Sequence, residues 1–268
     1  EWSFDYEVSY AYAEEDDSNN HDVTFRSENL QDIAPGAVTL DYSSAETPRL
    51  VASDAFIAAA YNPANYFLDT FEREFTTNED TEISGKFNVA KESFFGDVPV
   101  IWKAGVKLRD REKIRDVNLT FEEDDSLNLA DFVGGDLIED WRLDVPQPFW
   151  PDPNLTAALR GTFPADALNQ EDSVIDSTIE DYTIEEQILA GYFLGNFSLG
   201  ATTVIAGVRV EQTDVDLTGQ FLDAGDTTQF DFGSFATRNV SDDYTNVLPS
   251  VNVKHEFNDK LIGRAAYY

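Results

Sequence analysis

The sequence contains no cysteine and few basic residues, and both absences restrict its function. Without cysteine the chain forms neither a disulfide framework nor a thiolate metal site. Lysine and arginine number 18 against 52 aspartate and glutamate residues, a formal net charge of −34. So acidic a chain repels phosphate backbones, and we expect no nucleic-acid partner. No apolar run approaches the roughly 18 to 20 residues of a membrane helix, so any membrane contact must use β-strands or the surface.

Signatures of catalysis are also missing. The sequence contains no G-x-S-x-G, no phosphate-binding glycine loop and no EF-hand spacing. His21 and His255 are isolated histidines, so no zinc cluster is indicated, and no acid–base or nucleophile pair stands out. We therefore expect no enzyme activity and no cofactor. The acidic runs at 14–17 and 122–125 leave weak calcium binding open, against plain solvation of their charge.

Alternation of apolar and polar residues is abundant in this chain. Its clearest instance places an apolar side chain at every second position: Val100, Trp102, Ala104, Val106 and Leu108. Successive side chains of a strand point to opposite faces, so this row predicts one apolar face. Seven segments with such alternation are predicted as strands: residues 3–13, 83–94, 99–121, 183–195, 202–217, 244–257 and 261–268.

The segments between these strands alternate strictly in length. Long loops are predicted at 14–82, 122–182 and 218–243, and three short turns make the other connections. Compact domains rarely contain structureless loops beyond about 15 residues. Outer-membrane barrels combine short periplasmic turns with long extracellular loops, and only closure into a barrel lets strands span lipid. The predicted fold class is therefore all-β: an antiparallel transmembrane β-barrel section with long extracellular loops.

A soluble acidic β-sandwich with decorated loops is the alternative fold. Charge distribution favours the barrel. Residues 14–82 and 122–181 hold 32 of the 52 acidic residues but 5 of the 18 basic ones, whereas residues 83–121 hold 8 basic and 5 acidic residues. Negative charge is thus concentrated in the predicted loops.

The row opposite Val100 to Leu108 is basic. Its charged members share the parity that a barrel turns inward: Lys103, Lys107, Arg109 and Arg111. We expect their counter-charges on neighbouring strands, with Glu92 or Glu185 as candidates, or on a plug; a hydrated wall of a water-filled lumen is the alternative. On the lipid side we expect Ala104→Arg to impair assembly, and Gly105→Arg on the inward side to be tolerated better.

Four segments resemble consecutive strands of one known family. They are Tyr182–Tyr192, Ala206–Thr213 with the pattern A-G-x-R-x-E-x-T, Tyr244–Val253 with Y-x-x-x-L-P-S, and Leu261–Tyr267. Their order and spacing together resemble TonB-dependent outer-membrane receptors across residues 182–268. Over 1–121 the resemblance lies in the style of strands and turns.

The resemblance implies a barrel of about 22 strands with a plugged lumen, of which this sequence is an interior section without the plug and the closing strands. It also implies an outer-membrane location, extracellular loops, and the plug, the TonB complex and lipid as partners. Active uptake of a nutrient is the implied function. The large loops are like those of the subgroup that takes up oligosaccharides. A ferric-siderophore receptor of the same fold and a soluble acidic adhesin or binding module are the alternatives.

One loop segment carries the candidate ligand site. Pro146–Pro153 contains four of the ten prolines, which restrict the backbone around Phe149 and Trp150. Pre-ordered aromatic rings suit the apolar faces of sugars. The predicted ligand contacts are three rings and two carboxylates: Trp141, Phe149, Trp150, Asp144 and Asp152. The alternative is that these rings form a small core that holds the loop together.

Overall fold

The computed structural model describes residues 1–36, 38–43, 49–134, 149–222 and 235–268. The chain divides into two compact units, which we describe separately. Unit 1 comprises Glu1–Asp16, Thr76–Asp116 and Thr178–Tyr268, and unit 2 comprises Asp17–Phe75 and Val117–Ser177.

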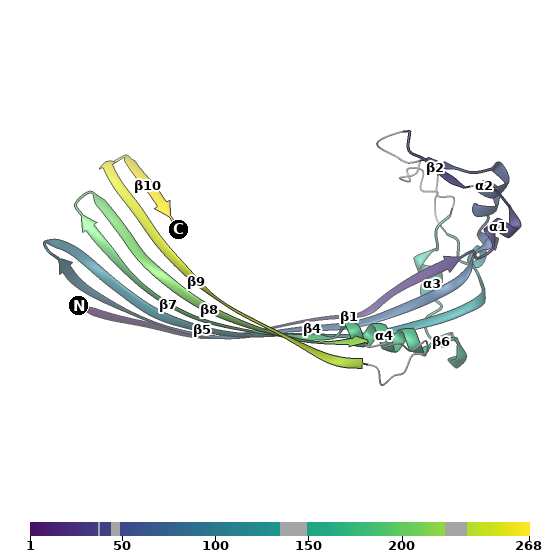
Figure 1. Ribbon diagram of the computed structural model, residues 1–268, viewed down its shortest axis with the longest axis horizontal. Coiled ribbons are helices and arrows are strands. Elements are labelled where there is room, and N and C mark those ends of the chain that lie inside the picture. The colour runs from purple at the N-terminus through teal and green to yellow at the C-terminus, as the bar shows by residue number, and fades with distance from the viewer. Residues whose placement is uncertain (37, 44–48, 135–148, 223–234) are drawn as a thin grey trace. The chain divides into compact units, whose positions relative to one another are not determined.

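Long neighbouring strands make up most of the described chain (Figure 1). They are β1 (Trp2–Arg26), β4 (Phe67–Phe95), β5 (Val98–Asn128), β7 (Tyr182–Leu199), β8 (Thr202–Leu222), β9 (Phe235–Asn258) and β10 (Leu261–Tyr267). Their order in the sheet is the order of the sequence, β1-β4-β5-β7-β8-β9-β10. The pairs β5–β7, β7–β8, β8–β9 and β9–β10 are antiparallel. The predicted all-β class is confirmed.

The strands are longer than the alternation predicted. β1 continues to Arg26, β4 begins at Phe67 and β5 continues to Asn128, so the bounds predicted for the loops at 14–82 and 122–182 are wrong. The loop predicted at 218–243 is shortened in the same way, because β8 and β9 remain paired as far as Leu222 and Phe235. Backbone hydrogen bonds hold a ladder without any apolar side chain. Pairing therefore continues past the point where both faces become polar.

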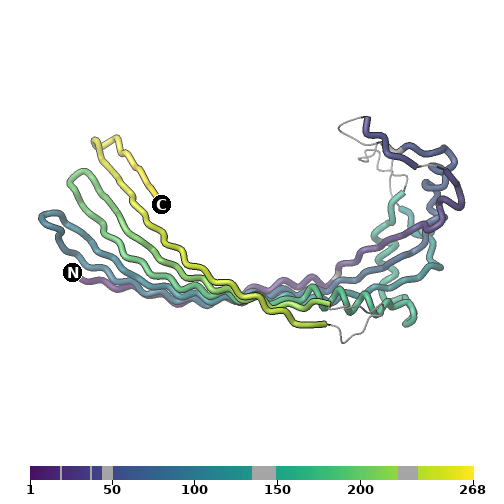
Figure 2. The backbone as a smooth tube through the Cα atoms, viewed as in Figure 1, coloured from purple at the N-terminus to yellow at the C-terminus, as the bar shows by residue number. Residues whose placement is uncertain are grey.

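Three short turns connect β4 to β5, β7 to β8 and β9 to β10, and they lie at the same end of unit 1 (Figure 2). Gly96 and Gly200 have φ values of 61° and 65° in the first two turns, a conformation that glycine adopts without strain. In the third, the Asn258 side chain accepts a hydrogen bond of 2.9 Å from the Lys260 N–H. Residues within each turn thus explain why the chain reverses there.

Unit 2 contains the shorter elements. They are α1 (Leu30–Ile33), β2 (Thr39–Asp41), β3 (Arg49–Val51), α2 (Asp54–Ala60), η1 (Pro63–Asn65), η2 (Leu129–Asp131), α3 (Pro153–Ala157), η3 (Ala165–Ala167), β6 (Leu168–Asn169) and most of α4 (Gln170–Glu180). Side-chain caps begin the α-helices α2 and α3. Ser53 accepts the Phe56 N–H at the start of α2, and Asp152 accepts two N–H groups at the start of α3.

A small apolar core holds unit 2 together. Leu68, Phe71 and Leu159 are buried in it, and Phe71 has no exposed surface. Phe163 and His21 lie against the Phe71 ring at centroid distances of 5.2 and 5.5 Å. The core thus joins β1, β4 and the segment after α3.

Helix α4 covers the edge of β5 where β7 no longer reaches it. The β5–β7 ladder ends at the pair Arg115↔Tyr182. Beyond it, the Leu119 N–H donates to Ser177 Oγ at 2.8 Å and the Phe121 N–H donates to Ser173 Oγ at 2.9 Å. Two residues along a strand and four along a helix both advance by about 6 Å, so the serines match the free N–H groups. The helix thereby satisfies a strand edge that would otherwise be open.

Candidate functional site

The register of unit 1 assigns each side chain to one of two faces. Directly paired residues of an antiparallel sheet share a face. Val100 pairs with Phe197, Ala104 with Phe193 and Leu108 with Leu189, so these residues lie on one side. On β1 and β4, the contacts Asp5–Asn88 and Glu7–Lys86 define the other side.

The first side, which we call the outer face, carries a continuous apolar band. Its members come from every strand of unit 1: Trp2, Phe4, Tyr6, Val8, Tyr10 and Tyr12; Ile83, Gly85, Phe87 and Val89; Val100, Trp102, Ala104, Val106 and Leu108; Leu189, Gly191, Phe193, Gly195 and Phe197; Val204, Ala206, Val208 and Val210; Val247, Pro249, Val251 and Val253; Ala265 and Tyr267. No member is charged. Tyr6 and Val8 are each 79% exposed. A soluble surface rarely leaves an apolar patch of this extent in water.

The band has the width of a membrane core. It runs over nine residues from Val100 to Leu108 and over eleven from Trp2 to Tyr12. A tilted membrane strand needs about 9–11 residues. The same parity turns polar immediately beyond the band, at Asp110 on β5. The apolar surface therefore ends sharply at the distance that a bilayer requires.

Aromatic side chains border the band near the short turns. The Trp102 ring stacks on Phe193 with centroids 5.4 Å apart and meets Phe197 edge-on at 5.5 Å. Phe95, at the β4–β5 turn, lies edge-on to Phe197 at 6.3 Å. Amphipathic and aromatic rings favour the boundary between lipid and water. The cluster therefore marks one edge of the band.

The second side, the inner face, is polar and ion-paired, and two members of the predicted basic row have partners there. Arg109 contacts Glu186 on β7 at 2.5 Å, and Arg111 forms a bidentate pair with Asp80 on β4. The partners lie on neighbouring strands, but the candidates Glu185 and Glu92 are wrong. Glu185 pairs with Glu112 on the outer parity. The Glu92 carboxylate lies 3.9 Å from the chain's amino group.

Lys103 and Lys107 share the inner face with these arginines, and among the described residues neither has an ion-pair partner within 4.0 Å. Beside Lys103 the inner face has a hydrogen-bonded cluster. Asn88 donates to Asp5 at 2.8 Å and accepts from the Tyr192 hydroxyl at 3.0 Å. Polar groups on this side thus bind one another across three strands.

Gly105 lies under this cluster. A Cβ atom at Gly105 would collide with Asn88 Oδ1 and would come within 2.5 Å of the Tyr192 ring. A side chain at residue 105 would therefore require Asn88 and Tyr192 to move, and the expectation that Gly105→Arg is tolerated better than Ala104→Arg stays a prediction.

The structure does not gather the predicted ligand residues into one site. Trp141 and Asp144 lie outside the described residues. The Phe149 ring packs edge-on against Tyr66 at 5.5 Å, and Trp150 is 46% exposed. Asp152 Oδ1 accepts the N–H groups of residues 154 and 155, which makes it a helix cap.

Tyr66 is fixed by its surroundings. Burial raises the pKa of its hydroxyl, which donates a hydrogen bond of 2.9 Å to the Ala60 carbonyl. Its contact with Phe149 therefore anchors the start of the described segment after residue 148. For Phe149 this agrees with the alternative that the loop rings serve packing.

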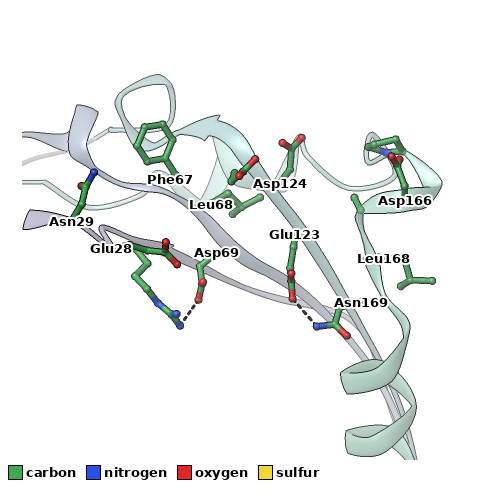
Figure 3. A pocket seen from close by; sticks show the side chains of 14 residues that line it. Glu28, Asn29, Phe67, Leu68, Asp69, Glu123, Asp124, Asp166, Leu168 and Asn169 are labelled. Carbon is green, nitrogen blue, oxygen red and sulfur yellow. Dashed lines mark hydrogen bonds and ion pairs between the residues drawn. The ribbon is translucent and has the colours of Figure 1, made fainter. Parts of the chain in front are cut away.

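Sequence reasoning missed a pocket of about 760 Å³ in unit 2 (Figure 3). It lies between the end of β1, the start of β4, the end of β5 and the η3–β6 segment. Arg26 pairs with Asp69 at 2.7 Å, and Asn169 donates to Glu123 at 2.7 Å. The acidic run at 122–125 was the only signal in the sequence. Nothing local predicts that residues near 26, 68, 123 and 168 meet.

Metal ligands do not converge in the part of the chain that the structure describes: no three histidine, aspartate or glutamate side chains there could hold one ion. Nor is any described helix long and apolar enough to cross a membrane.

Comparison with a known family model agrees with this geometry over part of the chain. Residues 147–268 match the model of the outer membrane protein beta-barrel family. No curated protein matches the chain. The match covers β7 to β10, which carry half of the apolar band. The band, the polar inner face and this match lead to one conclusion: the chain is a section of an antiparallel outer-membrane β-barrel protein, located in the outer membrane with its apolar band toward lipid.

Proposed function

We propose that the full-length protein is a TonB-dependent receptor that takes up a nutrient across the outer membrane, and that this nutrient is an oligosaccharide. The observation that carries the proposal is the ion-paired inner face behind the lipid-facing band. Arg109–Glu186 and Arg111–Asp80 are charged pairs that need a polar interior, either water or a plug. A sheet with these two faces suits a barrel through which polar solutes pass.

The strand motifs support a TonB-dependent receptor over a passive channel. The A-G-x-R-x-E-x-T pattern lies on β8 and the Y-x-x-x-L-P-S pattern lies on β9. These strands are adjacent and in register from Thr202↔His255 to Leu222↔Phe235. The plug and the TonB complex are proposed partners on the strength of this resemblance. They would supply the energy that a passive pore lacks.

Charge supports a neutral substrate over a highly anionic ferric siderophore. The chain's net charge is −34, and unit 2 holds 24 acidic residues against 5 basic ones. We propose that unit 2 is extracellular because of its own content: it contains the long connections between strands, which outer-membrane barrels place outside the cell. Anionic chelates would be repelled there at low salt, whereas a neutral sugar would not. The outer-membrane location excludes the soluble adhesin considered from the sequence.

Uptake by whole cells tests the proposal. Cells that express the full-length receptor are given fluorescently labelled neutral oligosaccharides, with and without a proton uncoupler, and the same cells without a functional TonB protein serve as control. We expect accumulation that needs both the membrane potential and TonB. Sugar entry that persists both in the presence of the uncoupler and in the cells without a functional TonB protein would show that the protein is a passive channel. Uptake of a labelled ferric siderophore but of no sugar would establish the alternative substrate.

A further inference from the structure

We propose that the pocket in unit 2 is a subsite for a neutral, hydroxyl-rich ligand such as one ring of an oligosaccharide. This inference rests on the proposed function and assigns its ligand contacts to residues other than those predicted from the sequence. A pocket of about 760 Å³ falls within the range of small-molecule sites, about 300–1,000 Å³. Figure 3 shows the side chains that line it.

The polar lining contains hydrogen-bond donors and acceptors that neighbouring side chains hold in place. Arg26 uses one nitrogen to contact Asp69, and its side chain remains 60% exposed, so other guanidinium N–H groups are open to a ligand. Asn169 donates to both Glu123 and Asp172, which holds its amide in place. Asp69 on β4 and Glu123 on β5 come from neighbouring strands. Mixed donors and acceptors of this kind match sugar hydroxyls, which both donate and accept.

An apolar surface completes the pocket. Phe67 lines it and is 43% exposed, although the next residue, Leu68, is buried in the core of unit 2. Leu168 also lines the pocket and is likewise 43% exposed. An exposed ring on a well-packed strand loses little entropy when a ligand covers it, and its flat face suits the apolar face of a sugar.

The charges select against anionic ligands. Six carboxylates and one guanidinium line the pocket, so a phosphate or sulfate group would be repelled. Within the described chain no three carboxylates converge as a metal site requires. An amine-bearing ligand would compete with Arg26 at Asp69 alone, and the other five carboxylates would attract it. The hydroxyl-matching donors and acceptors and the exposed Phe67 ring therefore carry the choice of a neutral ligand, and the test includes amine-bearing probes.

The test uses the purified full-length receptor in detergent. An array presents neutral gluco-, xylo- and manno-oligosaccharides beside glucosamine-containing and uronic-acid-containing ones, and calorimetry gives Kd for the best probe. We expect a neutral probe to bind best and Phe67→Ala to weaken it about tenfold, a change of about 1.4 kcal/mol. Phe75→Ala is the matched control, since Phe75 lies on the same strand, is 41% exposed and does not line the pocket. It should leave Kd unchanged.

Charge is tested separately with Glu123→Gln, which keeps the size of the side chain. We expect a severalfold loss of neutral-probe affinity, with Glu15→Gln, an exposed site on β1 outside the pocket, as control. Hydrogen exchange of the unit 2 amides checks that each variant is folded.

Three results would overturn the inference. If the neutral probe binds and Phe67→Ala behaves like Phe75→Ala, the subsite lies elsewhere, and the proposed function stands. If only glucosamine-containing probes bind and Glu123→Gln abolishes this, the pocket selects cations. If no probe binds and energised cells accumulate no sugar, the inference and the oligosaccharide function fail together.

Discussion

The two units of this chain keep apolar side chains from water in opposite ways, although β1, β4 and β5 contribute to both. Of the eleven buried apolar residues in the described chain, nine lie in unit 2 and two, Val100 and Ala190, lie in unit 1. Unit 1 instead places its large apolar side chains on the exposed outer face. Unit 2 therefore carries an internal core, whereas unit 1 relies on its hydrogen-bonded ladder and on surrounding lipid.

This contrast shows that two parts of one strand can be covered by different surroundings, lipid in one part and protein in the other. Along β4, Phe87 lies in the lipid-facing band, and Phe71 is fully buried in the core of unit 2. The aromatic residue type is the same in both places. What differs is whether lipid or protein covers the ring. The two units should therefore respond to different mutations.

The largest effect is expected from removing the centre of the unit 2 core. Phe71→Ala should destabilise unit 2 by about 3–5 kcal/mol, because it leaves a cavity where the ring had no exposed surface. Phe75→Ala, on the same strand and 41% exposed, should cost far less. Hydrogen exchange on the full-length protein would show faster exchange in unit 2 only. Equal loosening of the unit 1 ladder would break the distinction between the two units.

A charge on the outer face should damage unit 1 selectively. Ala104→Arg places a guanidinium within the apolar band, at a cost of about 2–4 kcal/mol near the bilayer midplane. Its control is Lys107→Arg, which keeps the charge on the inner face. Folding into lipid vesicles, followed by urea titration, measures both. Equal stability of the two variants would mean that residue 104 does not face lipid.

A smaller effect is expected from removing the hydrogen bonds between helix α4 and the edge of β5. Replacing Ser173 and Ser177 together by alanine removes the acceptors of two strand N–H groups, at about 1–3 kcal/mol for each group left unsatisfied. Amide exchange at Leu119 and Phe121 should accelerate, while Thr178→Ala on the same helix should leave it unchanged. Unaltered exchange in the double variant would show that the serines do not protect the edge.

The smallest effect concerns pH, and it falls on unit 2. His21 lies well beyond Tyr12, where the apolar band ends. Burial against Phe71 and then the guanidinium of Arg160, 2.6 Å from Nδ1, lower its pKa below the usual value, while Asp22 opposes them. The unfolded chain therefore binds the proton more readily. Unit 2 should lose stability as the pH falls below about 6.5 and lose no more once the pH is below the folded pKa.

Thermal melting of unit 2 between pH 5.5 and 8 measures this effect, since most carboxylates titrate below that window. His21→Asn should flatten the pH dependence. If the stability of unit 2 depends on pH as strongly in His21→Asn as in the unchanged protein, other titratable groups cause that dependence.

Some of the molecule was determined by local sequence alone. Alternation located the row from Val100 to Leu108, and glycine at 96 and 200 marked the tight turns. These are properties of residues a few positions apart, because the two-residue period of a strand and the φ of a turn need no distant partner. The outer-membrane barrel follows from them, since lipid leaves strands no other way to span.

Tertiary structure decided the faces, the partners and the pocket. On β7 both parities contain apolar residues, Leu189 and Phe193 on one and Tyr192 and Leu194 on the other, and only pairing with β5 shows that Phe193 belongs to the lipid side. The same register places the carboxylate of Glu186 in contact with Arg109. The pocket joins segments up to about 140 residues apart. Register and long-range contact depend on how the whole sheet pairs, and no local pattern in the sequence contains that information.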